Sequence, residues 1–288
     1  MIMIYRTLLA VIIFFALSSE NLCSQDALPE AVTSGPASGS LLIAGGGRLS
    51  ENIIKRFVEL AGGDKAVIVF VPTAGGADSY PDSICNFLRS AGAGNVTLLH
   101  TINRDTANSA YFTKSLDRAS GVWFGGGRQW HLVDSYKGTL TEKKFRDVLD
   151  RGGVIGGSSA GATIQGSFLV RGDTKNNQVM IGDHQEGFGY ISNIAIDQHV
   201  LARNRQFDMY GILRERPGLL GIGIDEGTAV VVRRDTMEVI GASYVLIYDG
   251  SFWSREGNDL KILPDRDHLF YTLRSGDRYN LHERKVIR

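Results

Sequence analysis

A serine in a turn of small residues is the strongest chemical signal in this sequence. Residues 157–161 read Gly-Ser-Ser-Ala-Gly, which fits the pattern G-x-S-x-G around Ser159, between an apolar strand pattern and a helical pattern. A nucleophile on such a sharp turn adopts a strained backbone, so only small neighbours fit around it, and Gly157 and Gly161 satisfy this need. The turn also aims the next amide, and the start of the following helix, at a developing oxyanion. We therefore predict that Ser159 is a nucleophile.

The alternative interpretation of this turn is a loop that binds a phosphate or merely packs. The P-loop pattern is excluded because no Gly-Lys-Ser or Gly-Lys-Thr follows. Gly156, Gly157 and Gly161 also do not have the spacing of the dinucleotide-binding pattern G-x-G-x-x-G.

A serine nucleophile needs a base, and one of the six histidines stands out by its position. His199 follows the apolar run IAIDQ, so it lies at the end of a predicted buried strand. Polar side chains crowded at a strand end suit a site, although a polar strand cap is an equally good interpretation of His199 alone.

The base in turn needs a carboxylate to orient it, and two candidates end another buried strand. Asp225 and Glu226 follow the run GIGI and precede a glycine, and burying two carboxylates without partners is costly. The residues alone leave Asp225 and Glu226 both open. The chain order of an α/β-hydrolase would instead use Asp225 or Asp249 with His268, but His268 has no glycine turn around it.

Composition limits the classes of protein to which these residues can belong. The chain has 288 residues, of which 43% are hydrophobic and 22% charged, as in an ordinary globular protein. The formal net charge is zero, which argues against a nucleic-acid-binding protein. Glycine is enriched, with 35 residues, and clusters at the ends of apolar runs, where α/β enzymes build their sites.

Strands and helices alternate through the first half of the chain. Continuously apolar strands that alternate with helices predict a parallel sheet covered on both faces, with the site at the carboxyl ends of the strands. Four closely spaced apolar runs between residues 219 and 250 predict an antiparallel extension of the sheet. The predicted strands are residues 41–47, 66–74, 95–100, 121–124 and 152–157, and the predicted helices are 49–60, 79–91, a segment through Trp130 and Val133, 141–150 and one from Ala160.

The N-terminus has the pattern of a targeting segment. A short basic region precedes an apolar run at residues 7–17, which is too short to span a bilayer, so we predict a signal peptide over residues 1–24. A linker over residues 25–40 and a single α/β domain over residues 41–288 complete the chain. We expect an exported protein, periplasmic or extracellular, without a membrane span after cleavage. Cys85 is then the one cysteine of the mature chain, and a buried core position is the favoured interpretation of it.

Four motifs in this order resemble the cyanophycinase-like serine peptidases of the S51 group, which also contains dipeptidase E. They are VWFGGGRQ, GGSSAGA, IDQH and GIGIDEGTA, and the resemblance covers about residues 41–249. It implies a three-layer α/β/α sandwich of the class I glutamine amidotransferase type, with a flavodoxin-like core. Cyanophycinase cleaves a poly-aspartate that carries arginine on its side chains to β-Asp-Arg dipeptides, and dipeptidase E cleaves Asp-Xaa dipeptides.

The resemblance also implies roles for particular residues of this chain. Ser159 is implied as the nucleophile, His199 as the base and Glu226, rather than Asp225, as the acid. The implied oxyanion hole consists of the backbone amides of Gly127 and Ala160. The implied substrate-binding residues are Gln129, Asp197, Gln198, Arg203 and Arg205.

Two positions depart from the family pattern. Cyanophycinases tend to read R-G-R-x-G-R-L after the histidine, whereas this chain has Asp208 in place of the third arginine. Arg128 stands where the family often has an aspartate in GGDQ. Catalysis is therefore better supported than specificity for cyanophycin.

The predicted function is hydrolysis of aspartyl or β-aspartyl peptide bonds through an acyl-enzyme, by a Ser-His-Glu triad. The predicted partner is a peptide with acidic residues, and no metal or organic cofactor is implied. The oligomeric state, monomer or homodimer, is left open. An esterase or amidase, and a catalytically silent binding protein on the same fold, are the alternatives.

Overall fold

The structure is a computed structural model that describes residues 34–258, 262, 264–265 and 268–288. They belong to one compact unit, Ala31–Arg288. The predicted signal peptide and most of the predicted linker lie outside the described residues. The described end of the linker is bound to the domain, because the amide of Ser34 donates to Ser192 Oγ at 3.1 Å and that of Gly35 donates to Asp235 at 3.1 Å.

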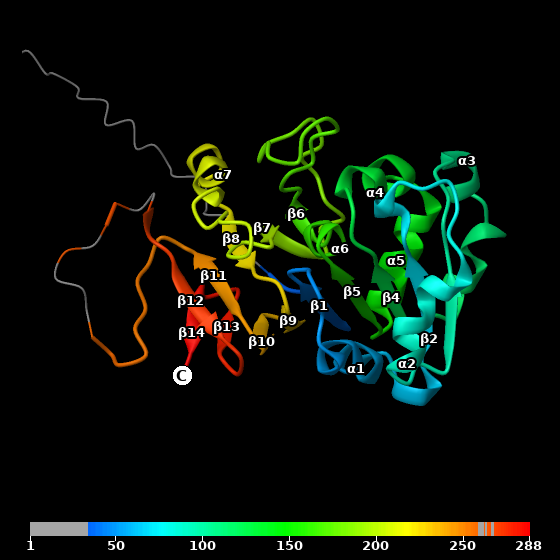
Figure 1. Cartoon of the computed structure of the whole chain (residues 1–288), viewed down its shortest axis with the longest axis horizontal. Coiled ribbons are helices and arrows are strands. Elements are labelled where there is room, and N and C mark those ends of the chain that lie inside the picture. Colours follow the sequence, from blue (N-terminus) through cyan, green and yellow to red (C-terminus); the bar gives the residue numbers. More distant parts are fainter. Residues whose placement is uncertain (1–33, 259–261, 263, 266–267) are drawn as a thin grey trace, which may run out of the picture. The chain divides into compact units, whose positions relative to one another are not determined.

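The larger of the two sheets that the structure describes has nine strands (Figure 1). Its order is β14-β13-β10-β9-β1-β5-β4-β2-β3. The five strands from β1 to β3 in this order are parallel, whereas β9, β10, β13 and β14 continue the sheet in antiparallel fashion. The bounds are β1 Ser40–Ala44, β2 Val67–Val71, β3 Asn95–Leu98, β4 Gly121–Phe124, β5 Val154–Ser158, β9 Thr228–Arg233, β10 Thr236–Gly241, β13 Arg278–Asn280 and β14 Lys285–Ile287.

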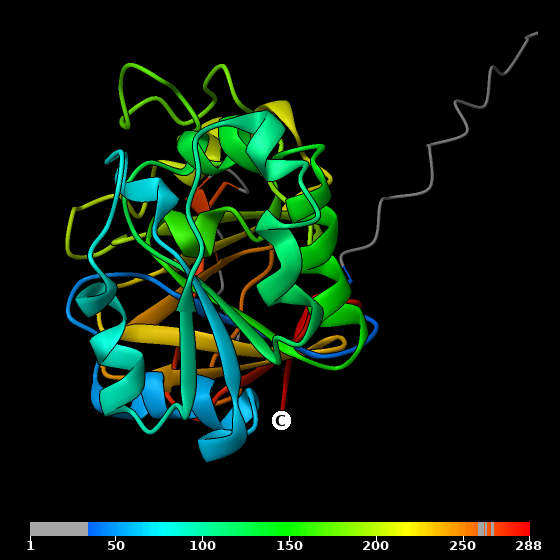
Figure 2. The same cartoon turned by 90° about the vertical axis from the view of Figure 1, so that its right-hand side faces the viewer.

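Helices cover both faces of the parallel strands because alternate side chains of each strand point to opposite faces. On β1, Leu42 and Ala44 pack into one hydrophobic cluster with α1, while Leu41 and Ile43 pack into another with α4 and α5. Helices α1 and α5 accordingly lie on opposite sides of the strands (Figure 2). The helices are α1 Glu51–Leu60, α2 Asn86–Ser90, α3 Arg104–Ala107, α4 Gln129–Tyr136, α5 Leu140–Asp150, α6 Ala160–Thr163 and α7 Met209–Glu215, and the 3-10 segments are Gly63–Lys65, Thr73–Gly75, Asp82–Cys85 and Phe112–Asp117.

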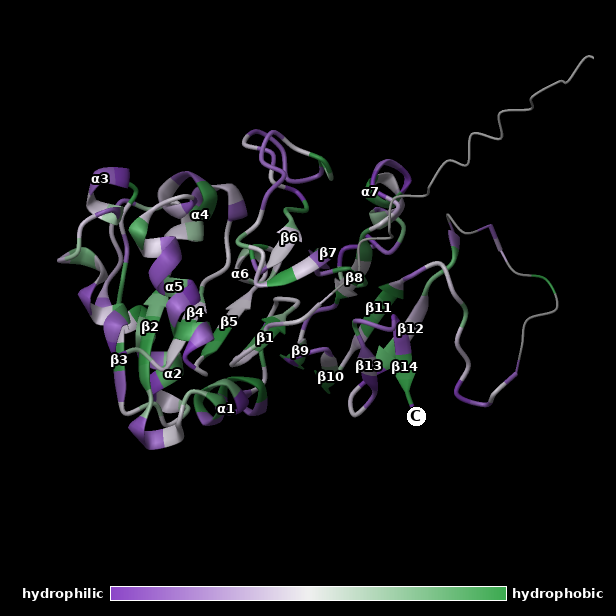
Figure 3. Cartoon of the chain, turned by 180° about the vertical axis from the view of Figure 1, so that it is seen from behind, coloured by the Kyte–Doolittle hydropathy of each residue, from purple (hydrophilic) through white to green (hydrophobic). Residues whose placement is uncertain are grey.

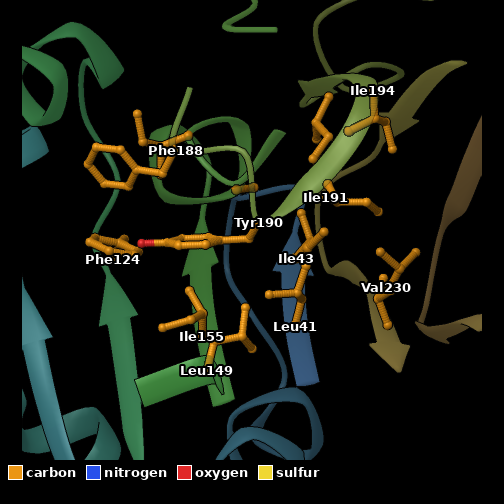
Figure 4. Close-up of a cluster of buried hydrophobic side chains, with 14 of the residues drawn as sticks. Leu41, Ile43, Phe124, Leu149, Ile155, Phe188, Tyr190, Ile191, Ile194 and Val230 are labelled. Atoms are coloured by element: carbon orange, nitrogen blue, oxygen red, sulfur yellow. The ribbon is translucent and has the colours of Figure 1, made fainter. Parts of the chain in front are cut away.

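A second, five-stranded sheet has the order β12-β11-β8-β7-β6. One face packs against the cluster that contains Leu41 and Phe124, and the other face carries α7. Figure 4 shows Ile191 and Ile194 of β7 in this shared core with Ile43 of β1. The strands are β6 Gly166–Phe168, β7 Ile191–Gln198, β8 Leu220–Ile224, β11 Tyr244–Tyr248 and β12 Tyr271–Arg274.

The α/β sandwich predicted from the sequence is confirmed, and the antiparallel extension is divided between the two sheets. Strands β9 and β10 extend the first sheet, whereas β8 and β11 belong to the second. The division arises at residues 225–227, where Gly227 has φ 66° and the chain turns from β8 to β9. Strand β2 is mostly hydrophobic in Figure 3, as expected for a strand covered on both faces. Cys85 is buried, as the core interpretation predicted.

Candidate active site

Ser159 occupies the sharp turn that its motif predicts. It lies between β5 and α6 with φ 58° and ψ −113°, a backbone region that non-glycine residues rarely adopt. A side chain at Gly157 would lie 2.2 Å from the carbonyl oxygen of Gly161, so the two ends of the turn approach each other too closely for any residue but glycine at position 157. The turn therefore requires the small residues that flank the serine.

Ser159, His199 and Glu226 form a continuous chain of hydrogen bonds. The hydroxyl Oγ of Ser159 lies 2.9 Å from Nε2 of His199, and Nδ1 of the same ring lies 2.5 Å from Oε1 of Glu226. The His199 side chain is buried, whereas that of Glu226 is 38% exposed. This geometry allows the imidazole to accept the serine proton while the carboxylate orients it.

Asp225, the other candidate carboxylate at this strand end, has different partners. Asp225 Oδ1 accepts the backbone amides of Leu201 and Ala202, and its Oδ2 accepts the hydroxyl of Ser243 at 2.6 Å. Burial acts to raise the pKa of Asp225, but these hydrogen bonds outweigh it and hold the pKa below its ordinary value. Asp225 thus fixes the backbone that follows His199, and Glu226 is the carboxylate that contacts the imidazole.

The structure does not bring His268 and Asp249 together as the α/β-hydrolase order of residues would require. Asp249 accepts the hydroxyls of Tyr271 and Tyr279 at 2.7 and 2.9 Å, and the ring of His268 lies beside Tyr210. Asp249 is therefore bound by tyrosines of β12 and β13, and the exposed His268 contacts a tyrosine of α7.

The end of β1 holds together, through its backbone, the three segments that carry Ser159, His199 and Glu226. Three consecutive carbonyls accept amides from them: that of Ala44 from Ser159 at 3.0 Å, that of Gly45 from His199 at 3.0 Å, and that of Gly46 from Gly227 at 3.1 Å. Sequence reasoning noted the glycines at residues 45–47 as a strand end but missed this role.

Glycines in this segment leave room for the triad side chains. A side chain on Gly46 would lie 2.3 Å from the His199 ring, and one on Gly47 would lie 2.4 Å from the Glu226 carboxylate. Both glycines also have positive φ, at 108° and 65°. The triple glycine was the signal in the sequence, because side chains at these positions would occupy the space of the His199 ring and the Glu226 carboxylate.

Of the predicted oxyanion hole, Ala160 directly follows the serine, and Gly127 belongs to a turn that lies beside it. Ala160 is the first residue of α6, so its amide has no acceptor within the helix. A side chain on Gly126 would lie 3.5 Å from Cβ of Ser159, which places the turn of residues 125–127 beside the nucleophile. Gly127 has φ 140°, and a side chain there would lie 2.0 Å from the carbonyl oxygen of Ala74.

Burial lowers the pKa of His199 below its ordinary value. The Glu226 hydrogen bond opposes this effect, and the charges of Arg203 and then Arg205 add to the lowering. The imidazole is therefore neutral at pH 7, the form that can accept a proton from Ser159.

This protonation state gives a pH dependence with a defined sign. We expect kcat/KM on an uncharged substrate to fall as the pH falls, with its inflection below about 6.5, because protonation removes the base. A pH–rate profile from about pH 4 to 8 measures it. An inflection above pH 7 would contradict the assignment of a buried, neutral His199.

Two of the five predicted substrate-binding residues are engaged by protein groups. Gln129 is buried, and its side-chain amide donates to the carbonyls of Val170 and Arg171 at 2.5 and 2.8 Å. The carboxylate of Asp197 is bound on both oxygens by the guanidinium of Arg171, at 2.9 and 3.0 Å. In this structure the side chains of Gln129 and Asp197 therefore bind the segment that contains Val170 and Arg171.

The other three predicted residues have side chains with few protein partners. Gln198 is 6% exposed, and its Oε1 has no partner among the described residues. Arg205 is 4% exposed and donates one hydrogen bond, of 3.4 Å, to the carbonyl of Gln198. Arg203 is exposed, and neither arginine forms an ion pair with any residue that the structure describes.

The two departures from the family pattern also have protein partners. Asp208 binds Arg171 at 2.6 Å, so the carboxylate that replaces the family's third arginine is neutralised within the protein. The guanidinium of Arg128 donates to the carbonyl of Asp173. Sequence reasoning missed Arg171, since it lies in none of the four motifs.

A large cavity lies elsewhere in the part of the chain that the structure describes, away from Ser159, His199 and Glu226. A cavity of about 1210 Å³ at the end of β3 is lined by residues such as Tyr80, His100 and Phe112, and by none of the predicted site residues. Within the described ranges no cluster of three or more His, Cys, Asp or Glu could hold a metal ion. The same residues include no helix with the length and apolar character needed to cross a bilayer.

Comparison with known proteins agrees with this architecture. The model of peptidase family S51 matches residues 41–240, most of the α/β sandwich. The chain belongs to peptidase family S51 and is a serine-type peptidase.

Within this family the chain is similar to cyanophycinases. It is 30% identical to the cyanophycinase of Geminocystis herdmanii over 255 residues, 84% of this chain and 93% of that protein. It is 30% identical to the cyanophycinase of Trichormus variabilis over 251 residues, 82% of each chain. Among solved structures, a peptidase from an acI-B1 Actinobacterium matches with a TM-score of 0.60 and 25% identity, over 84% of this chain and 97% of that one. The resemblance to cyanophycinase-like peptidases is confirmed.

Proposed function

We propose that this protein is an exported serine peptidase that hydrolyses aspartyl or β-aspartyl peptide bonds through Ser159, His199 and Glu226. The observation that supports the triad is the hydrogen-bonded chain from the Ser159 hydroxyl through both nitrogens of His199 to the Glu226 carboxylate. Export rests on the sequence pattern of residues 1–24 alone.

The proposed reaction is acyl transfer to the serine followed by hydrolysis. Nε2 of His199 takes the proton as Oγ of Ser159 attacks the scissile carbonyl, and Glu226 stabilises the imidazolium that forms. The amides of Gly127 and Ala160 would stabilise the oxyanion. His199 then protonates the leaving amine, and a water molecule that it activates releases the acyl group.

Positive charge beside the triad supports an acidic substrate. The amide of Arg203 donates to the carbonyl of His199 at 3.0 Å and that of Arg205 to the carbonyl of Val200 at 2.6 Å, so both arginines lie in the turn that follows the base, and their charges lower the pKa of His199. Neither has an internal carboxylate partner among the described residues. A guanidinium binds a carboxylate by two parallel hydrogen bonds, which suits the free carboxylate of an aspartyl residue.

A substrate panel tests this proposal. The mature protein would be assayed on cyanophycin, Asp-Xaa dipeptides, isoaspartyl dipeptides and a simple ester, and we expect hydrolysis of at least one aspartyl or β-aspartyl substrate. Release from cyanophycin would identify it as the substrate, whereas release from dipeptides alone would indicate altered specificity. Turnover of the ester alone would indicate an esterase, and no turnover of any compound would indicate a silent binding protein.

A further inference from the structure

Arg171 is the most completely buried large side chain among the charged residues that the structure describes. It is 1% exposed, and its backbone has φ 57°, in the left-handed region. A buried guanidinium is costly unless carboxylates and further hydrogen bonds satisfy its donors. The partners of Arg171 therefore bear on how this part of the site is built.

The guanidinium of Arg171 links three segments around the site. Its Nε and one terminal nitrogen bind both oxygens of Asp197 on β7, two residues before His199. The same terminal nitrogen binds Asp208, immediately before α7, at 2.6 Å. The other terminal nitrogen donates to the carbonyl of Asn177 at 3.2 Å. Gln129 of α4 in turn holds the Arg171 carbonyl.

Arg205 lies in the field of the same charges but is not paired with them. The charges of Arg171, Asp197 and Asp208 all act on its pKa, which burial lowers first and the charge of Arg171 lowers further. Both carboxylates are nevertheless bound to Arg171 rather than to Arg205. The buried Arg205 guanidinium thus retains donors that no internal carboxylate occupies.

We propose that Arg171 is a positioning residue for substrate recognition, because it binds Asp197 and Asp208 and so leaves Arg205 available to a carboxylate of the substrate. This inference rests on the proposed function, and it identifies an anionic group of the substrate as the ligand of Arg205. Asp208, which in sequence reverses a charge of the family pattern, acts through Arg171 and does not repel the substrate directly.

The proposal predicts that removing Arg171 and removing the charge of Asp208 have opposite effects on the preference for a ligand with a carboxylate, although the two residues form one ion pair. Without Arg171, Asp197 and Asp208 have no cation but Arg205, which would turn toward them. Without the charge of Asp208, Arg171 still binds Asp197, and the local charge becomes more positive by one. An ion pair that served stability alone would destabilise the fold when either end is removed and would leave the ratio of the two dissociation constants unchanged.

The test measures ligand binding to Ser159→Ala protein, in which hydrolysis does not interfere. The two probes are N-acetyl-β-aspartyl-alaninamide, which carries one carboxylate, and its analogue with a carboxamide at that position. Calorimetric titration gives the ratio of the two dissociation constants for the reference protein and for Arg171→Met, Asp208→Asn and the double variant. Asp117→Asn, which removes the partner of Lys144 at the surface, is the matched control.

We expect the reference protein to prefer the carboxylate probe by about tenfold or more. Arg171→Met should reduce this preference to near unity, and Asp208→Asn should increase it by about threefold to tenfold, as expected for the loss of one nearby like charge. The double variant should recover part of the preference, since only Asp197 then competes for Arg205. Asp117→Asn should leave the ratio unchanged.

Three results would overturn the proposal: an absent preference in the reference protein, a decrease with Asp208→Asn, or equal effects of Arg171→Met on both probes. If Arg171→Met does not fold, as thermal unfolding would reveal, the sign of the change in Asp208→Asn decides. Hydrolysis by the protein with Ser159 intact is measured separately. Selective carboxylate binding without peptide hydrolysis would refute the proposed function and leave the inference about Arg171 standing.

Discussion

Ser159→Ala is expected to lower kcat by about 10⁴-fold or more on every peptide that the wild-type protein hydrolyses. The substitution removes the oxygen that lies 2.9 Å from His199 Nε2, and no acyl-enzyme can form without it. The fold should persist, because the turn is held by the Ser159 amide, which donates to the carbonyl of Ala44, and not by the hydroxyl. Kinetics on the preferred substrate, together with thermal unfolding, measures both effects.

The adjacent serine supplies a matched control. Ser158 ends β5 and pairs with Ala44 of β1, so Ser158→Ala removes one hydroxyl from the same turn without touching the hydrogen-bonded triad. We expect kcat of Ser158→Ala to stay within about threefold of wild type, a change in the barrier of less than about 0.7 kcal/mol, because the lost hydroxyl is not part of the hydrogen-bonded chain. Wild-type turnover by Ser159→Ala would remove the central claim about the nucleophile.

The sequence could single out Ser159 and His199, which the structure brings within hydrogen-bonding distance, because each follows a strand end in a recognisable pattern. Ser159 lies in a glycine turn between a strand and a helix, and His199 ends an apolar run. The sequence did not show that the two strand ends belong to different sheets: Ser159 follows β5 of the nine-stranded sheet, whereas His199 follows β7 of the five-stranded sheet. The structure adds that the carbonyls of Ala44 and Gly45, at the end of β1, bind the amides of both residues.

The acid could not be chosen from the residues alone, since Asp225 and Glu226 are neighbours at the same strand end. Both lie in the turn after β8, where their side chains reach different surroundings: Asp225 accepts the amides of residues 201 and 202, and Glu226 contacts the imidazole. Only the resemblance to the S51 family favoured Glu226.

Contacts between residues far apart in the sequence could not be predicted from it. Arg171 binds residues that lie 26 and 37 positions away, and it follows a short strand with no motif around it. The assignment of β8 and β11 to a second sheet was hidden for the same reason, because an apolar run shows that a strand is buried but not which strand it pairs with.

Glu226→Gln is expected to lower kcat by about 10³-fold to 10⁴-fold with little loss of stability. A glutamine amide that donates toward Nδ1 favours the tautomer with its proton on Nε2, and the lone pair that must accept the serine proton is then lost. Stability should change little because the Glu226 side chain is 38% exposed. Steady-state kinetics and thermal unfolding on the same preparations measure the two quantities.

Asp225→Asn should have the reverse effects of Glu226→Gln: a clear loss of stability and a small change in kcat. Asp225 accepts two backbone amides and the Ser243 hydroxyl, so its replacement by an amide weakens charge-assisted hydrogen bonds and should destabilise the fold by about 1–3 kcal/mol. Its effect on kcat should be far smaller than that of Glu226→Gln, because its carboxylate does not contact the imidazole. If Asp225→Asn instead removed activity at full stability while Glu226→Gln stayed active, the acid of the triad would be Asp225. The 2.5 Å contact between His199 and Glu226 would then be a structural bond rather than the one that orients the catalytic imidazole.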